Sequence, residues 1–181
     1  MNDERVDWSS RLRSGPLYTA VPLKRWAIMY PRRNETESEN FIKCLVDVGR
    51  GMKYEISEPK RKVLQDDRTD SYIRELNELV NMDPKLIMCI VTNNKADRYS
   101  AIKKLCCVSH AIPTQVVLVK TITPKNPGGL LSIASKVVIQ LNCKLGNFFS
   151  YSQTDVEMFY LLISSIVLLS KVVLHGWSQY H

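Results

Sequence analysis

Short, continuous apolar runs alternate along the chain with longer segments in which every third or fourth residue is apolar. Runs of the first kind, at 24–30, 86–91 and 115–121, have the length and composition of buried strands. A weaker strand is expected at 53–56, followed by a charged loop over 57–68. The pattern predicts a sheet whose central strands are covered on both faces.

Segments with apolar residues at helical spacing separate these runs, and each predicts a helix with one buried face. Two of them start near Ser38 and Thr69, and two more cover 95–107 and 130–145. Strands that alternate with helices form a parallel sheet with right-handed crossovers. The sequence therefore predicts an α/β fold with a Rossmann-like parallel sheet flanked by helices.

The same pattern divides the chain into three parts. Residues 1–22 are polar and interrupted by glycine and proline, so they are expected to be a linker remnant. Residues 23–146 hold the predicted sheet and its helices. Residues 147–181 are a divergent hydrophobic tail, and we expect an apolar helix there.

Within the tail, residues 158–174 are apolar except for serines and Lys171, and their length is at the lower edge of a membrane span. Three interpretations stay open. The segment is a tail anchor with Lys171 at one interface, a helix from a truncated gene product that packs on the domain or aggregates, or a helix that binds a soluble partner.

The charge balance indicates which kinds of partner the chain can bind, and the cysteine content indicates its cellular compartment. Lysine plus arginine (25) outnumber aspartate plus glutamate (18), and the excess lies before residue 147. Such an excess attracts a phosphate backbone, although many basic proteins bind no nucleic acid. Five cysteines without a CxxC pair, and an N-terminus without the apolar run of a signal peptide, predict a cytoplasmic or nuclear protein that is not secreted.

Polar side chains with ligand-like spacing occur on two predicted helices. Tyr99 and Lys103 are four residues apart and share a face, which suits a stacked base and its phosphate or an ordinary solvated surface. Gln140 and Lys144 have the same spacing on the last helix, with the same two interpretations. Gln115 opens an otherwise apolar strand and is either a rim residue or a ligand contact.

Three separated segments carry a resemblance to a known family. Residues 97–104 (DRYSAIKK), 112–117 (IPTQVV) and 139–146 (IQLNCKLG) closely resemble the MID domain of Piwi-clade Argonautes in order and spacing. The resemblance runs from about Trp8 to Gly146 and includes the linker before that domain. It implies binding of a small single-stranded guide RNA, a piRNA, by its 5′-phosphorylated end, in RNA-mediated silencing of transposons.

The resemblance also assigns roles to the four residues that match the family's 5′-phosphate pocket. Tyr99 is expected to stack on the first guide base and touch the phosphate. Lys103, Gln115 and Lys144 are expected to contact the phosphate directly.

Two further roles follow from the resemblance. A loop that senses the first base, for which Piwi proteins prefer uridine, is expected at Thr92, Asn93, Asn94 and Lys95. Gln140 stands where Ago-clade relatives carry lysine, and in Piwi proteins this amide helps to hold a Mg²⁺ that bridges guide phosphates. A neutral carbonyl is a hard oxygen ligand for Mg²⁺, and the metal supplies the charge that a lysine would have given.

The family's motif normally continues beyond Gly146 into a nuclease domain, whereas residues 147–181 resemble nothing in that domain. We therefore expect no cleavage of target RNA, and weakened Mg²⁺ binding without the terminal carboxylate that the full protein supplies. The alternative function is a non-catalytic fragment that acts through its apolar tail as a protein- or membrane-interaction module. An enzyme of another kind finds little support, because the sequence holds no nucleophile elbow, P-loop or metal-ligand cluster.

Overall fold

The computed structural model describes residues 17, 19–126 and 128–145, and this part of the chain contains a four-stranded sheet in the order β2-β1-β3-β4. Its strands are β1 (Trp26–Pro31), β2 (Lys60–Leu64), β3 (Leu86–Val91) and β4 (Thr114–Leu118). Each neighbouring pair is parallel, so each connection crosses over the sheet. The prediction of an α/β fold with a parallel sheet is confirmed.

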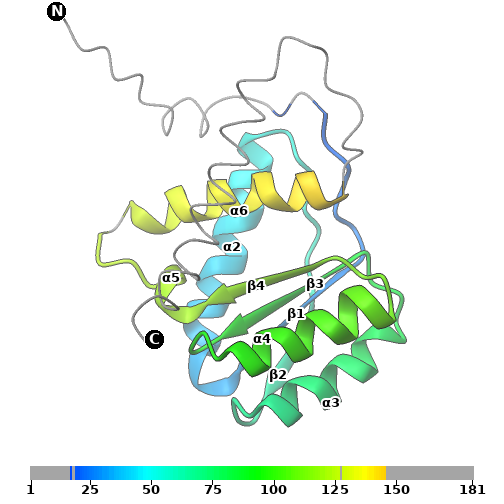
Figure 1. Cartoon of the computed structure of the whole chain (residues 1–181). Coiled ribbons are helices and arrows are strands. Elements are labelled where there is room, and N and C mark those ends of the chain that lie inside the picture. The colour runs from blue at the N-terminus through cyan, green and yellow to red at the C-terminus, as the bar shows by residue number, and fades with distance from the viewer. Residues whose placement is uncertain (1–16, 18, 127, 146–181) are drawn as a thin grey trace, which may run out of the picture.

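Helices cover both faces of this sheet, as Figure 1 shows. One face packs against α2 (Glu35–Gly51), α5 (Val119–Ile122) and α6 (Gly129–Leu145). The other face packs against α3 (Thr69–Val80) and α4 (Ala96–Lys103). Two hydrophobic cores result, one on each side of the sheet.

The central strands β1 and β3 are buried along their whole length and divide their side chains between the two cores. Ile28 and Met88, paired across the two strands, enter the core beneath α2 and α6. Met29 and Cys89, the next pair, enter the core beneath α3 and α4. Successive side chains of a strand point to opposite faces of the sheet, so one continuous apolar run supplies residues to both cores.

One strand was predicted at the wrong place, and another was predicted too long. The expected strand at 53–56 contributes only a bridge between Ile56 and Leu23, and β2 lies instead inside the expected loop. The edge strand β2 begins with three charged residues, of which Lys60 and Arg61 are exposed and Lys62 is half-buried, so it lacks the apolar run that marks a buried strand. At the other edge, β4 ends at Leu118 and the next residues turn into α5.

The connection from α4 to β4 contains two uncommon backbone conformations. After Lys103 the helix continues as a π-helical turn, η2 (Lys104–Ser109). Ala111 then adopts φ 52°, a left-handed conformation that non-glycine residues rarely take. This turn brings the chain back into β4 directly beside the end of α4.

Part of the expected linker is attached to the domain. The Leu17 amide donates to the Met52 carbonyl at 3.0 Å. The Asn142 side chain donates to the Thr19 carbonyl at 2.8 Å and accepts from the Val21 amide at 3.2 Å. These bonds tie the segment before β1 to α6 and to the residue that follows α2.

The expected tail at 147–181, its apolar helix and the candidate span at 158–174 lie outside the described residues. Within the described ranges, the helices are too short or too polar to cross a bilayer.

Candidate anion-binding site

Two lysines from different helices meet at one backbone carbonyl. Lys103 lies at the end of α4 and Lys144 in the last turn of α6, and each ammonium donates to the Thr114 carbonyl oxygen at 2.8 Å. Lys103 also donates to the Thr114 hydroxyl at 2.9 Å. The first residue of β4 therefore holds two positive charges side by side.

Two glutamine amides complete this arrangement. The Lys144 ammonium donates to Oε1 of Gln115, and Nε2 of Gln115 donates to Oε1 of Gln140 at 3.4 Å. We call Lys103, Thr114, Gln115, Gln140 and Lys144 the cup. Its members come from α4, β4 and α6, and their polar groups form one connected set.

Tyr99 lies beside the cup on α4. The Lys103 ammonium is 5.7 Å from the centre of the Tyr99 ring, within the range of a cation–π contact. The side chain is 45% exposed, so its ring is available to a stacking partner. The structure thus brings together the residues that the sequence singled out for base and phosphate contact.

The cup carries positive charge that the described carboxylates do not neutralise. Within the described ranges, neither Lys103 nor Lys144 forms an ion pair with aspartate or glutamate. Burial of the ammonium, and then the charge of Lys103, lower the pKa of Lys144 to about 8, while Cys107 opposes this shift. Lys144 is an exposed residue, whereas its ammonium donates to the Thr114 carbonyl. Such an arrangement favours an anion.

The cup does not lie where ligands usually bind in open parallel sheets. They usually bind beyond the carboxyl ends of the strands, where helix N-termini offer free amides. The cup lies at the amino end of β4 and at the C-terminal ends of α4 and α6 (Figure 1). Helix α4 crosses over from β3 to β4, so its end returns to this edge, and α6 runs back toward the same edge after β4 and α5. Lysine side chains, not helix N-termini, supply the positive charge.

A cavity of about 210 Å³ opens next to Tyr99. Asn93, Asn94 and Lys95 line it from the loop after β3, and Val116 lines it from β4. Thr92 belongs to the same expected loop but does not line the cavity, because its hydroxyl donates to Asp67 on the opposite side. The expected base-sensing loop is therefore divided between three cavity residues and one that faces the protein.

Gln140 offers oxygen but little else to a metal ion. The described residues contain no cluster of three or more histidine, cysteine, aspartate or glutamate side chains. The neutral oxygens of the cup are those of Thr114 and of two glutamines, and the oxygens of Thr114 and Gln115 already accept from the lysines. This donor set fits a Mg²⁺ that takes most of its ligands from phosphates and water.

Sequence reasoning missed Thr114, whose carbonyl and hydroxyl form the floor of the cup. Every residue has a carbonyl, so no residue-type signal marks this one. Cys107 was also passed over, although its thiol lies 3.3 Å from the Thr114 hydroxyl.

Comparison with known proteins identifies the family. A family model described as the Piwi domain matches residues 86–172. The protein Piwi of Drosophila melanogaster is 43% identical over 145 residues, which are 79% of this chain and 17% of that protein. The chain belongs to the Piwi-clade Argonautes. The family match runs past residue 146, where we expected the resemblance to stop.

One solved structure supports the assignment to the Piwi clade, and another shows the fold. The crystal structure of Drosophila Piwi matches with a TM-score of 0.73 at 43% identity, over 77% of this chain and 20% of that one. The MID-PIWI domains of a N. crassa AGO match with a TM-score of 0.54 at 11% identity, over 72% of this chain and 36% of that one, which shows the fold alone. The chain spans about a sixth of the length of the curated relatives, as the 17% coverage of Drosophila Piwi illustrates.

Proposed function

We propose that this chain binds the 5′-phosphorylated end of a small single-stranded guide RNA of the piRNA type and contributes to RNA-mediated silencing of transposons. One observation carries the proposal: the Lys103 and Lys144 ammonium groups converge on the Thr114 carbonyl at 2.8 Å each, without a described carboxylate between them. Two cations held this closely repel each other, and a terminal phosphate relieves that repulsion.

The neighbouring elements suit the first nucleotide of such an RNA. The exposed Tyr99 ring offers a stacking surface next to Lys103. The cavity beside it has apolar walls from Val91 and Val116 and amides from Asn93 and Asn94. Stacking holds a base of any kind, whereas amide groups distinguish bases by their edges, and we propose uridine as the preferred first base.

We propose that Mg²⁺ accompanies the RNA rather than occupying a protein site of its own. When bound, the metal would supply positive charge between guide phosphates. Gln140 would contribute its amide oxygen, and the two lysines would hold the terminal phosphate. Binding of the metal would then depend on the RNA, because the cup has neutral oxygens and no carboxylate among its members.

We also propose that the chain binds RNA without cutting it. The cup holds cations and amides, whereas metal-assisted hydrolysis of RNA requires carboxylates that hold catalytic metals. A cleavage assay with a labelled RNA complementary to the bound guide tests this point. Appearance of a metal-dependent product from the purified chain would contradict it.

The test of guide binding compares two RNAs of the same sequence, one with a 5′ phosphate and one with a 5′ hydroxyl. Fluorescence titration of the full 181-residue chain should give tighter binding of the phosphorylated RNA. The difference should persist as salt is raised, because it depends on the directional contacts of the cup. Equal, salt-sensitive binding of both RNAs would reduce the interaction to general attraction by a basic surface.

A further inference from the structure

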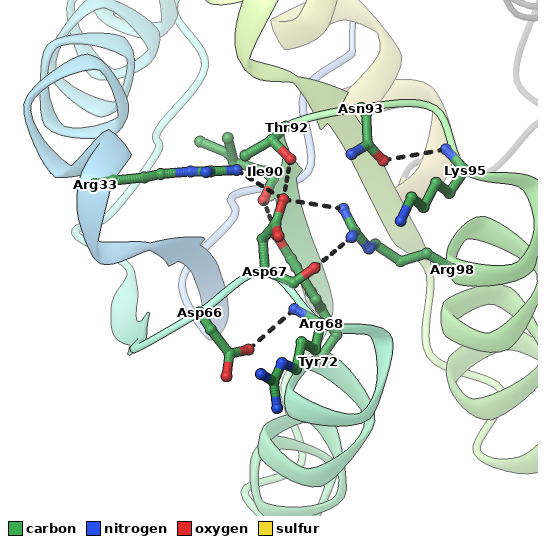
Figure 2. Close-up of polar contacts among 10 residues, drawn as sticks. All are labelled: Arg33, Asp66, Asp67, Arg68, Tyr72, Ile90, Thr92, Asn93, Lys95 and Arg98. Atoms are coloured by element: carbon green, nitrogen blue, oxygen red, sulfur yellow. Dashed lines mark hydrogen bonds and ion pairs between the residues drawn. The ribbon is translucent and has the colours of Figure 1, made fainter.

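Asp67 is the centre of a polar network behind the candidate base-binding loop (Figure 2). Its carboxylate accepts from the Arg33 guanidinium at 2.8 Å and from the Thr92 hydroxyl. Arg98 donates to the Asp67 carbonyl and places its Nη1 3.8 Å from the same carboxylate. One residue therefore joins three partners from distant parts of the chain.

The sheet order explains why these partners meet. Arg33, Asp67 and Thr92 follow β1, β2 and β3 respectively, and these three strands are parallel neighbours in the order β2-β1-β3. Their carboxyl ends lie at one edge of the sheet, so the residues after them converge. Asp67 reaches across this edge to the loop that follows β3.

Arg98 makes the network a buried one. Its residue is 3% exposed, and its guanidinium lies 5.1 Å from the centre of the Tyr72 ring. Its Nε and Nη1 have no hydrogen-bond partner within the described part of the chain. Asp67 thus supplies the nearest negative charge to a buried cation, and removing it would leave Arg98 uncompensated.

The network contacts both ends of the loop 93–95, which lines the cavity. Thr92 comes directly before Asn93, and Arg98 lies on the first turn of α4, directly after the loop. Between them, the side-chain oxygen of Asn93 accepts a hydrogen bond from the Lys95 amide at 3.4 Å, within the loop. Arg98 also lines the cavity with Asn93 and Lys95. One aspartate outside the loop therefore contacts residues on both sides of it.

We propose that Asp67, acting through Thr92 and Arg98, is a positioning residue that fixes the loop 93–95 and thereby sets which first nucleotide the cavity accepts. This inference rests on the proposed binding of a guide 5′ end. It separates two tasks within the site. The cup recognises the phosphate, and the Asp67 network determines the discrimination between bases.

The test uses a matched pair of substitutions at Thr92. Thr92→Val keeps the shape of the side chain and removes the hydroxyl that donates to Asp67, whereas Thr92→Ser keeps the hydroxyl. Each full-length variant is titrated with RNAs that differ only in the first nucleotide, with a 5′ phosphate and with a 5′ hydroxyl. We expect Thr92→Val to lose most of the preference among first nucleotides while it keeps the preference for phosphate. Thr92→Ser should keep both.

A network that merely stabilises the fold would give a different result. Thr92→Val would then weaken all RNAs alike, or lower the melting temperature without changing the base preference. Either outcome, or a wild-type chain that prefers phosphate but no particular base, would overturn the inference. If the wild-type chain does not distinguish phosphate from hydroxyl, the proposed function itself fails.

Hydrogen exchange gives a second readout that does not depend on RNA. Asp67→Asn should speed exchange of the amides at 93–95 in the full chain, because the amide group binds Arg33 and Arg98 less strongly than a carboxylate does. Exchange in β1 and β3 should stay unchanged. Unchanged exchange at 93–95 in a folded variant would contradict the positioning role.

Discussion

Lys103 and Lys144 donate to the same oxygen, the carbonyl of Thr114, from the ends of two helices on opposite faces of the sheet. This convergence requires β4 to lie at the edge of the sheet, where both helices can reach over it. A group that binds the two ammonium groups must carry negative charge and be small enough to share the space above one residue.

Removing either cup lysine should weaken the preference for a 5′ phosphate. Each ammonium would make a charge-assisted hydrogen bond worth about 1.5–3 kcal/mol, so Lys103→Ala and Lys144→Ala should each cost roughly tenfold to hundredfold in affinity for phosphorylated RNA. A parallel titration with RNA that has a 5′ hydroxyl shows how much of the loss in affinity comes from the phosphate. Lys104→Ala and Lys136→Ala serve as controls, because both residues are exposed on the same helical segments. Equal losses in all four variants would indicate a diffuse electrostatic effect.

The affinity for 5′-phosphorylated RNA should fall as the pH rises through about 8, where Lys144 loses its proton in the free chain. The phosphate stays doubly charged over this range, because its second pKa is about 6. Lys144→Arg should flatten the profile between pH 7 and 9, since a guanidinium stays charged there. A wild-type profile identical to that of Lys144→Arg would contradict the prediction.

The same shift in pKa affects folding with the opposite sign. Lys144 titrates near 8 in the folded chain and near 10.5 when unperturbed. The unfolded chain therefore binds more protons between these values, so the contribution of this group to stability rises with pH across that window. Denaturant titrations at pH 8 and pH 10, compared with Lys144→Met, measure the contribution.

Mg²⁺ should raise the affinity for phosphorylated RNA only when Gln140 is present. Gln140→Leu keeps the approximate size of the side chain and removes the oxygen proposed for the metal, so the increment from Mg²⁺ should disappear. In excess chelator, the affinity of Gln140→Leu for phosphorylated RNA should differ less from that of the wild-type chain, because both keep the two lysines. Persistence of the full Mg²⁺ effect in Gln140→Leu would assign the metal to other oxygens.

A bound 5′ phosphate should protect Cys107 from alkylation. This thiol is exposed and lies 3.3 Å from the Thr114 hydroxyl, whereas Cys89 and Cys106 are buried. Mass spectrometry of the iodoacetamide-treated chain should show slower labelling of Cys107 with phosphorylated RNA than with hydroxyl RNA. The same labelling rate with both RNAs, at saturating concentration, would place the phosphate elsewhere.

Ala111→Gly should stabilise the domain. The φ of 52° at Ala111 costs about 1 kcal/mol for a residue with a Cβ, and part of the gain is lost to the greater freedom of glycine in the unfolded chain. We expect an increase of about 0.5 kcal/mol in the free energy of unfolding. The matched control is Ala101→Gly in α4, which should lower the free energy of unfolding by about 0.5–1 kcal/mol.

The sequence predicted the strands well where they are fully buried and less well at the edges of the sheet. The run at 86–91 predicted β3 with its bounds, because a strand covered on both faces must be apolar throughout. The edge strand β2 was missed, since Lys60, Arg61 and Lys62 look like a loop until their neighbours are known. The bend at Leu118 was missed for a related reason, because valine-rich sequence continues past the point where the strand ends.

The sequence alone determined the α/β alternation and, through three family-like segments, the identity of Tyr99, Lys103, Gln115, Gln140 and Lys144 as candidates. These depend on residue type and local spacing, which are written in the chain. Tertiary structure decided that the lysines share the Thr114 carbonyl, that the cup lies at the amino end of β4, and that Asp67 reaches the loop after β3. Such contacts depend on strand order and on backbone groups common to all residues, so no local pattern could specify them.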